Sequence, residues 1–75
     1  MNRVAVTSSN IVSVGYDQAT QVLEVEFRSG GIYRYTGVTQ EQHQELMAAP
    51  SIGSHYHAHI KNKFPAEKVE QEAAA

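Results

Sequence analysis

The chain has 75 residues and no cysteine, which excludes a disulfide framework, a thiolate zinc site and a cysteine nucleophile. Its length makes one small domain with a thin core, and no apolar run approaches the ~20 residues of a membrane-spanning helix. The formal net charge is −2, but acidic and basic residues balance up to Ala66, so any attraction for nucleic acid must come from a local patch. The absence of disulfides and of a signal peptide's apolar segment predicts a cytoplasmic protein.

Alternation of apolar and polar residues predicts β-strands in the first half of the chain. Val4 and Val6 allow a short edge strand near the N-terminus. A strand over residues 10–16 would bury one face, and the next strand alternates apolar with charged side chains. The apolar positions predicted to face the core are Val12, Val14 and Tyr16, followed by Leu23, Val25 and Phe27.

Ser29-Gly30-Gly31 predicts a turn into a returning strand that carries Tyr33-Arg34-Tyr35. The length of the loop decides which way the tyrosines face. A two-residue loop places them opposite Glu24 and Glu26 on the outer face, whereas a three-residue loop with a glycine bulge places them on the core face. We favour the longer loop, because a small core needs the ~150–250 Å² that each aromatic ring buries. Arg34 would then point outward.

A capping box predicts the first helix. Thr39 can cap this helix while Gln42, three residues later, reaches back to the cap. Glu41 suits the positive N-terminal end of the helix dipole. The helix should stop at Ala49, because a residue that precedes proline disfavours helical geometry.

Ser51 begins a second predicted helix, which Pro65 ends. Its apolar residues recur every four positions and form one stripe. They are Ile52, Tyr56, Ile60 and Phe64. Residues 66–75 lack such a stripe, so we predict a fraying helix or a disordered tail there. The domain would span residues 1–66, with a flexible acidic and alanine-rich tail at residues 67–75.

These elements predict an α+β fold, in which an antiparallel β-meander of three or four strands is followed by two α-helices packed on one face. Several short motifs occur along it in a fixed order, between about residues 8 and 64. They comprise Ile11, Val14, Gly15 and Tyr16; Leu23, Val25, Phe27 and Gly30; Tyr33 and Tyr35; Val38; Ala49, Ser51 and Gly53; and Ile60 and Lys61. The set resembles the KTSC domain, a small module at the C-terminus of some lysyl-tRNA synthetases that also occurs as a stand-alone bacterial protein. The resemblance implies the fold, and the synthetase context suggests RNA binding.

Tyr33-Arg34-Tyr35 has two interpretations. On a sheet surface, bases would stack on the tyrosines while Arg34 supplies charge. In the core, the rings would be buried with their hydroxyls at the rim. Arg34 would then lie beside Glu24 and Glu26, which repel phosphate. We favour the core interpretation.

Lys61 and Lys63 form the densest local positive charge. Two roles are open for them: contact with phosphate groups, or complementing the dipole at a helix C-terminus, which we favour. If RNA binds, we expect the contacts to come from a set of aromatic and basic residues. The candidate nucleic-acid-binding residues are Tyr33, Arg34, Tyr35, Lys61 and Lys63.

His55, His57 and His59 alternate along the second predicted helix. His55 and His59 share a face at a spacing that can chelate zinc or copper, but His57 points elsewhere, so only two ligands remain. We therefore predict no metal site and no other cofactor. Serine–histidine catalysis would need an orienting acid and an oxyanion hole, and this helix offers no acid.

The sequence thus predicts a small non-catalytic binding module. RNA, bound through a local basic and aromatic patch, is the first candidate partner. A protein partner, bound at an exposed sheet edge or an apolar helix face without nucleic acid, is an alternative of nearly equal weight. We expect neither a membrane nor a small-molecule substrate as a partner.

Overall fold

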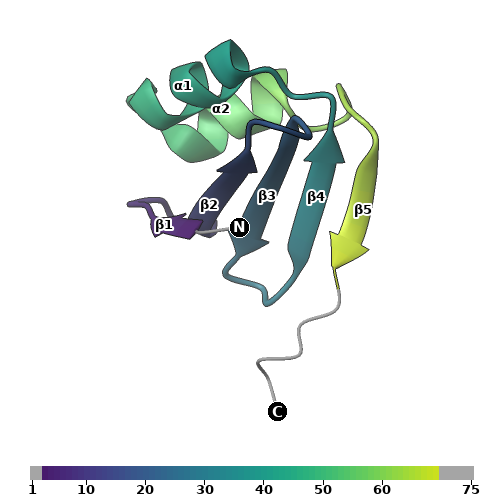
Figure 1. Cartoon of the computed structure of the whole chain (residues 1–75). Coiled ribbons are helices and arrows are strands. Elements are labelled where there is room, and N and C mark those ends of the chain that lie inside the picture. The colour runs from purple at the N-terminus through teal and green to yellow at the C-terminus, as the bar shows by residue number, and fades with distance from the viewer. Residues whose placement is uncertain (1–2, 70–75) are drawn as a thin grey trace.

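In a computed structural model of the chain, residues 3–69 are described and form one antiparallel sheet of five strands in the order β1-β2-β3-β4-β5, together with two helices. The strands are β1 (Arg3–Ala5), β2 (Ile11–Asp17), β3 (Val22–Phe27), β4 (Ile32–Thr36) and β5 (Ala66–Val69); the helices are α1 (Gln40–Ala48) and α2 (Ile52–His59). Both helices pack on one face of the sheet, whose edges are β1 and β5 (Figure 1). No helix within residues 3–69 has the length and apolar character needed to cross a membrane.

The predicted α+β fold is confirmed: a meander of four strands is followed by two helices on one face. The turn between β3 and β4 is the longer of the two alternatives. The Phe27 N–H donates to the Gly31 carbonyl at 2.8 Å, which leaves a three-residue loop, and Gly30 takes the positive φ of +102° that glycine accepts without strain. This register aligns Tyr33 with Val25 on the core face, as predicted.

The second strand departs from the predicted alternation. A β-bulge between Ile11 and Ser13 makes Val12 an extra residue, so Ile11 and Val14 both face the core. Ile11 is fully buried and Val12 is half-buried, so the prediction that Val12 is the core residue is wrong. Strict alternation of apolar and polar residues cannot reveal this bulge, because Val12 is inserted into the strand without a neighbouring glycine or proline that would indicate it.

The hydrophobic core lies between the sheet and the two helices. Strands β2, β3 and β4 contribute buried side chains to it. Leu46 of α1, Val38 of the loop before α1 and Ile60, the C-cap of α2, complete the buried set. The buried members of the core are Ile11, Val14, Leu23, Val25, Tyr35, Val38, Leu46 and Ile60. The Tyr35 hydroxyl meets that of Tyr56, and burial followed by this hydrogen bond raises the pKa of Tyr35 well above its usual value of 10.0.

The predicted helix caps are present. Thr39 accepts a hydrogen bond from the Gln42 N–H at 3.2 Å, and Gln42 Oε1 accepts one from the Thr39 N–H at 2.9 Å, which completes the capping box. Helix α1 ends with Ala49 as its C-cap, as predicted. The Ser51 hydroxyl caps α2 by accepting from the Ser54 N–H at 3.3 Å.

Helix α2 ends at His59, so the prediction that it runs to Pro65 is wrong. Asn62 takes a positive φ of +64°, a left-handed conformation that asparagine tolerates better than most residues. The turn around Asn62 redirects the chain towards the sheet, where the Pro65 carbonyl accepts a hydrogen bond from the Thr36 N–H. Phe64 still packs against the core, although it does so from outside the helix.

The prediction of a tail from residue 67 is wrong for residues 67–69, which belong to β5. This strand pairs with β4 and covers an edge that would otherwise expose unpaired backbone N–H and C=O groups. The segment Ala66–Val69 is a weak strand former, so the pairing with β4 overrides its local preference. Residues 70–75 of the predicted tail lie outside the described residues.

The assignment of the core makes a prediction about stability. Leu46→Ala should lower the free energy of unfolding by about 2–5 kcal/mol, because the Leu46 side chain is fully buried between the helices and the sheet. Val4 is 58% exposed, so Val4→Ala should change it by less than about 0.5 kcal/mol. Denaturant unfolding measures both changes, and equal losses would contradict this core.

Candidate nucleic-acid interface

The sheet face opposite the helices carries a compact network of charges. Glu24 of β3 accepts hydrogen bonds from Arg3 Nη1 at 2.6 Å and from Arg34 Nε at 2.8 Å. These arginines cover the carboxylate, so that the side chain of Glu24 is only 7% exposed. Glu26 lies beside the network, where it accepts from the Ser13 hydroxyl, and Glu67 of β5 stands opposite Arg34. This face is therefore largely self-neutralised.

The charge state of Glu24 follows from its two arginine partners. Burial alone would raise the pKa of this carboxyl group, but the hydrogen bonds and positive charges of Arg34 and Arg3 outweigh burial. The pKa of Glu24 is therefore lowered from its usual value of 4.5, and the group is ionised at neutral pH. Because Arg34 is committed to this carboxylate, it is poorly placed to bind a phosphate group.

The five residues predicted to bind nucleic acid do not form one surface. Tyr35 is buried and Tyr33 is half-buried on the helix side of the sheet, while Arg34 points to the other side, opposite Glu24. Lys61 and Lys63 are exposed in the segment that follows α2. The fold therefore brings Tyr33 and Tyr35 near Lys61, which lines the same groove, but separates all three from Arg34.

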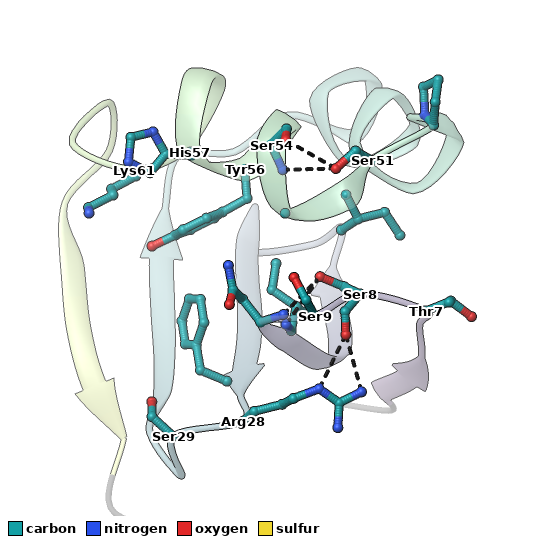
Figure 2. A pocket seen from close by; sticks show the side chains of 16 residues that line it. Thr7, Ser8, Ser9, Arg28, Ser29, Ser51, Ser54, Tyr56, His57 and Lys61 are labelled. Atoms are coloured by element: carbon teal, nitrogen blue, oxygen red, sulfur yellow. Dashed lines mark hydrogen bonds between the residues drawn. The ribbon is translucent and has the colours of Figure 1, made fainter.

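A groove of about 620 Å³, here called the polar groove, opens on the helix side of the molecule (Figure 2). It lies between the loop that joins β1 to β2, the turn after β3, and helix α2. Its lining consists of residues 7–11, 27–29, 50–54, Tyr56, His57 and Lys61. These lining residues include many hydroxyl groups and two basic side chains, Arg28 and Lys61, but no aspartate or glutamate.

Backbone contacts hold the walls of the polar groove in place. The Ser8 hydroxyl accepts hydrogen bonds from the N–H groups of Asn10 and Ile11, which shapes the loop as a tight turn. The Ser8 carbonyl accepts from Arg28 Nε and Nη2 at 3.2 and 3.1 Å, which fixes the plane of the guanidinium group. A Cβ atom on Gly53 would lie 3.2 Å from the Ser8 hydroxyl oxygen, so glycine there lets α2 approach the loop.

A second groove, here called the aromatic groove, continues from the first. It has a volume of about 530 Å³ and shares Phe27, Ser29, Tyr56 and Lys61 with the polar groove. The ring of Phe27 packs against Tyr56 at a centroid distance of 5.2 Å and an interplanar angle of 64°. Tyr33 contacts the same phenylalanine edge to face. Together the grooves form one surface that changes from hydroxyl-rich to aromatic along its length.

Sequence reasoning missed Arg28, Phe27 and Tyr56 as members of a site. Arg28 follows the alternation of β3 in the sequence, so it was expected on the outer face with Glu24. It is instead the first residue of the three-residue loop, where the strand has ended and alternation no longer predicts direction. The glycines of the following turn were the sequence signal that β3 ends before Arg28, because the loop length places Arg28 in the loop.

The two histidines with chelating spacing lie together on α2. The ring centroids of His55 and His59 are 4.4 Å apart. Within residues 3–69, no three or more histidine, cysteine, aspartate or glutamate residues are grouped so that they could hold a metal ion. The described part of the chain therefore supplies no third ligand to His55 and His59.

The fold and grooves define a small α+β domain with one largely self-neutralised sheet face and one grooved surface whose groove linings contain no acidic residue. The family model described as the KTSC domain matches residues 7–64, and the chain belongs to this family. The resemblance seen in the sequence motifs is thereby confirmed. The crystal structure of a KTSC domain protein from Yersinia pestis is 42% identical and has a TM-score of 0.90, with 92% of this chain and 97% of that one covered.

Relatives occur both as small proteins and as segments of large ones. An uncharacterised protein of Stutzerimonas stutzeri is 49% identical over 61 residues, which cover 81% of this chain and 86% of that protein. A lysine–tRNA ligase of Nostoc punctiforme is 41% identical over 61 residues, which cover 81% of this chain but only 11% of the ligase. The chain thus corresponds to a small segment of that ligase.

The Glu24 network predicts a pH dependence of stability. Because the folded pKa of Glu24 is lowered, its contribution to stability is present above about pH 4.5 and is lost as the pH falls through the folded pKa. Glu24→Gln should reduce the free energy of unfolding at neutral pH by about 1.5–3 kcal/mol and flatten the loss in acid. Urea unfolding at several pH values measures both effects.

The matched control for this prediction is Glu45→Gln, because Glu45 is exposed on α1. It should leave both the stability at neutral pH and the acid dependence nearly unchanged. An acid dependence in Glu24→Gln as steep as in the unmodified chain would show that the network does not hold the pKa of Glu24 down.

Proposed function

We propose that this chain is a non-catalytic RNA-binding module and that the polar and aromatic grooves form its binding surface. The observation that carries the proposal is the distribution of charge. Arg28 and Lys61 line grooves whose linings contain no acidic residue, and half-buried aromatic rings lie next to them. A positively charged groove with aromatic side chains suits a nucleic-acid strand, because it attracts phosphates and offers surfaces to bases.

The charges on the opposite face support the same assignment. Within residues 3–69 the ion pairs involve Arg3 and Arg34 but neither Arg28 nor Lys61. The acidic side chains of β3, Glu24 and Glu26, point away from the grooves. A polyanion approaching the groove side therefore meets cations that are not already neutralised there, although the net charge of the chain is negative.

The relatives supply a second line of support. By its name, a lysine–tRNA ligase acts on tRNA, and a segment of such a ligase is 41% identical to most of this chain. A module that adds RNA contacts would be useful both inside such an enzyme and alone. This role places the chain where RNA is present, in keeping with the expected cytoplasmic location.

The grooves favour binding over catalysis. The polar groove offers serines and His57 but, among its lining residues, no carboxylate that would orient a histidine as a general base. Hydroxyl groups without such a partner act as hydrogen-bond donors and acceptors rather than as nucleophiles. We therefore retain the assignment as a non-enzymatic module.

A protein partner is the second candidate, and one observation favours it. Val4 is 58% exposed on β1, a short strand at the edge of the sheet. An extended segment of another protein would add to such an edge through backbone hydrogen bonds. A single exposed apolar side chain is not a patch, however, so this observation weighs less than the acid-free grooves.

The proposal predicts that RNA binding depends on Arg28 and not on Arg34. Arg28→Gln should weaken the binding of a mixed single-stranded RNA pool several-fold at about 50 mM salt. It should also reduce the slope of log affinity against log salt concentration by about 0.7, the value for one phosphate contact on a single strand. Fluorescence anisotropy titrations at several salt concentrations measure both.

Arg34→Gln is the matched control, because it removes the same charge from the opposite face of the sheet. Its binding should stay close to that of the unmodified chain, and a melting curve should show that the variant is folded. Equal losses in the two variants would mean that only net charge matters. The absence of RNA binding by the unmodified chain at low salt would reject the proposal and leave a protein partner as the candidate.

A further inference from the structure

We infer that the two grooves bind a single RNA strand with an unstacked base held between Arg28 and Lys61, and that they discriminate against a stacked duplex. This inference rests on the proposed function and adds the form of RNA that the site takes. It depends on the placement of the cations, on the recessed aromatic rings between them and on the size of the domain.

The two cations lie far apart along the polar groove. Figure 2 shows Arg28 and Lys61 at opposite ends, with Tyr56 projecting from α2 between them. Arg28 extends from the loop after β3, and its two hydrogen bonds to the Ser8 carbonyl hold it in one orientation. A strand that crosses the groove would therefore place a phosphate group near each cation, with at least one nucleoside between them.

The space between the cations is bounded by aromatic rings. Phe27 and Tyr56 line both grooves and are half-buried, so each ring reaches the groove without standing out from it. Their edge-to-face contact and the hydrogen bond between the hydroxyls of Tyr56 and Tyr35 restrict their movement. A base can contact rings recessed in this way only after it has left the helical stack.

Hydroxyl and amide groups complete the site around the base and sugar. Asn10, Ser51 and Ser54 lie in the wall of the polar groove, and their side chains are exposed. They supply donors and acceptors without introducing negative charge. Such groups suit a ribose hydroxyl or the edge of an unpaired base, both of which an unstacked nucleotide presents.

The dimensions of the domain argue against duplex recognition. Its principal extents are 34 × 27 × 22 Å. Domains that recognise double-stranded RNA contact two successive minor grooves and the major-groove phosphates between them, over about 16 base pairs. The polar groove offers two cations, Arg28 and Lys61, in a single groove rather than at the several grooves that such a duplex presents.

The test uses one RNA strand of mixed sequence and about 16 nucleotides in three forms, with the unmodified chain at about 50 mM salt. The forms are the intact single strand, the same strand with abasic sites at alternate positions, and the strand annealed to its complement. We expect the intact strand to bind tightest, with affinity lower by about tenfold or more for the abasic strand and for the duplex. Fluorescence anisotropy measures all three.

The outcomes separate the inference from the function on which it rests. Equal affinity for all three forms, or tighter binding of the duplex, would overturn the inference and leave RNA binding through phosphate contacts intact. An abasic strand that binds as well as the intact strand would likewise overturn it, because no base would then be held by the aromatic rings. Failure of every form to bind would reject the proposed function as well.

Discussion

The three-residue loop between β3 and β4 is the constraint on which the arrangement of the molecule depends. Because side chains alternate along a strand, the loop length decides which residues of β4 face the helices. With three residues, Tyr33 and Tyr35 join the helix side and Arg34 faces Glu24 on the other side. A shift of one residue would reverse this and place a guanidinium group in the core. The glycine that accepts φ of +102° in this loop therefore helps to separate the aromatic from the charged residues of β4.

That separation gives the two faces different chemistry. On the outer face, the carboxylate of Glu24 in β3 is shielded by Arg3 of β1 and Arg34 of β4. This buried carboxylate therefore links β1 and β4, which lie on opposite sides of the β2–β3 pair. Such a pair contributes modestly to stability, but removal of one partner is costly because the other charge stays buried. On the helix side the polar and aromatic grooves keep Arg28 and Lys61 without acidic neighbours in their linings. A chain of negative net charge thus retains a locally basic surface.

Local signals predicted the parts of the fold that depend on local contacts. The capping box at Thr39 and Gln42 is formed, because its partners are three residues apart. The end of α2 was not predicted because no proline or glycine marks it, and the left-handed turn at Asn62 follows it. The bulge at Val12 and strand β5 were not predicted, because each depends on pairing with another strand. For the same reason, adjacency in sequence grouped Tyr33 and Arg34 into one candidate site, although alternation places them on opposite faces. The grooves could not be predicted, since their lining comes from segments that only the folded sheet brings together.

The extent of the family match bears on where a shared function would lie. The match covers residues 7–64, which include the whole lining of the polar groove. Strand β1, with the exposed Val4, and strand β5 lie outside it. A function common to stand-alone proteins and to a segment of a lysine–tRNA ligase needs a site inside the common segment. The polar groove meets this requirement, whereas the β1 edge lies outside the residues that the family model matches. A protein-binding edge at β1 would therefore be an addition to the matched segment, whereas a ligand shared across the family would have to bind within that segment.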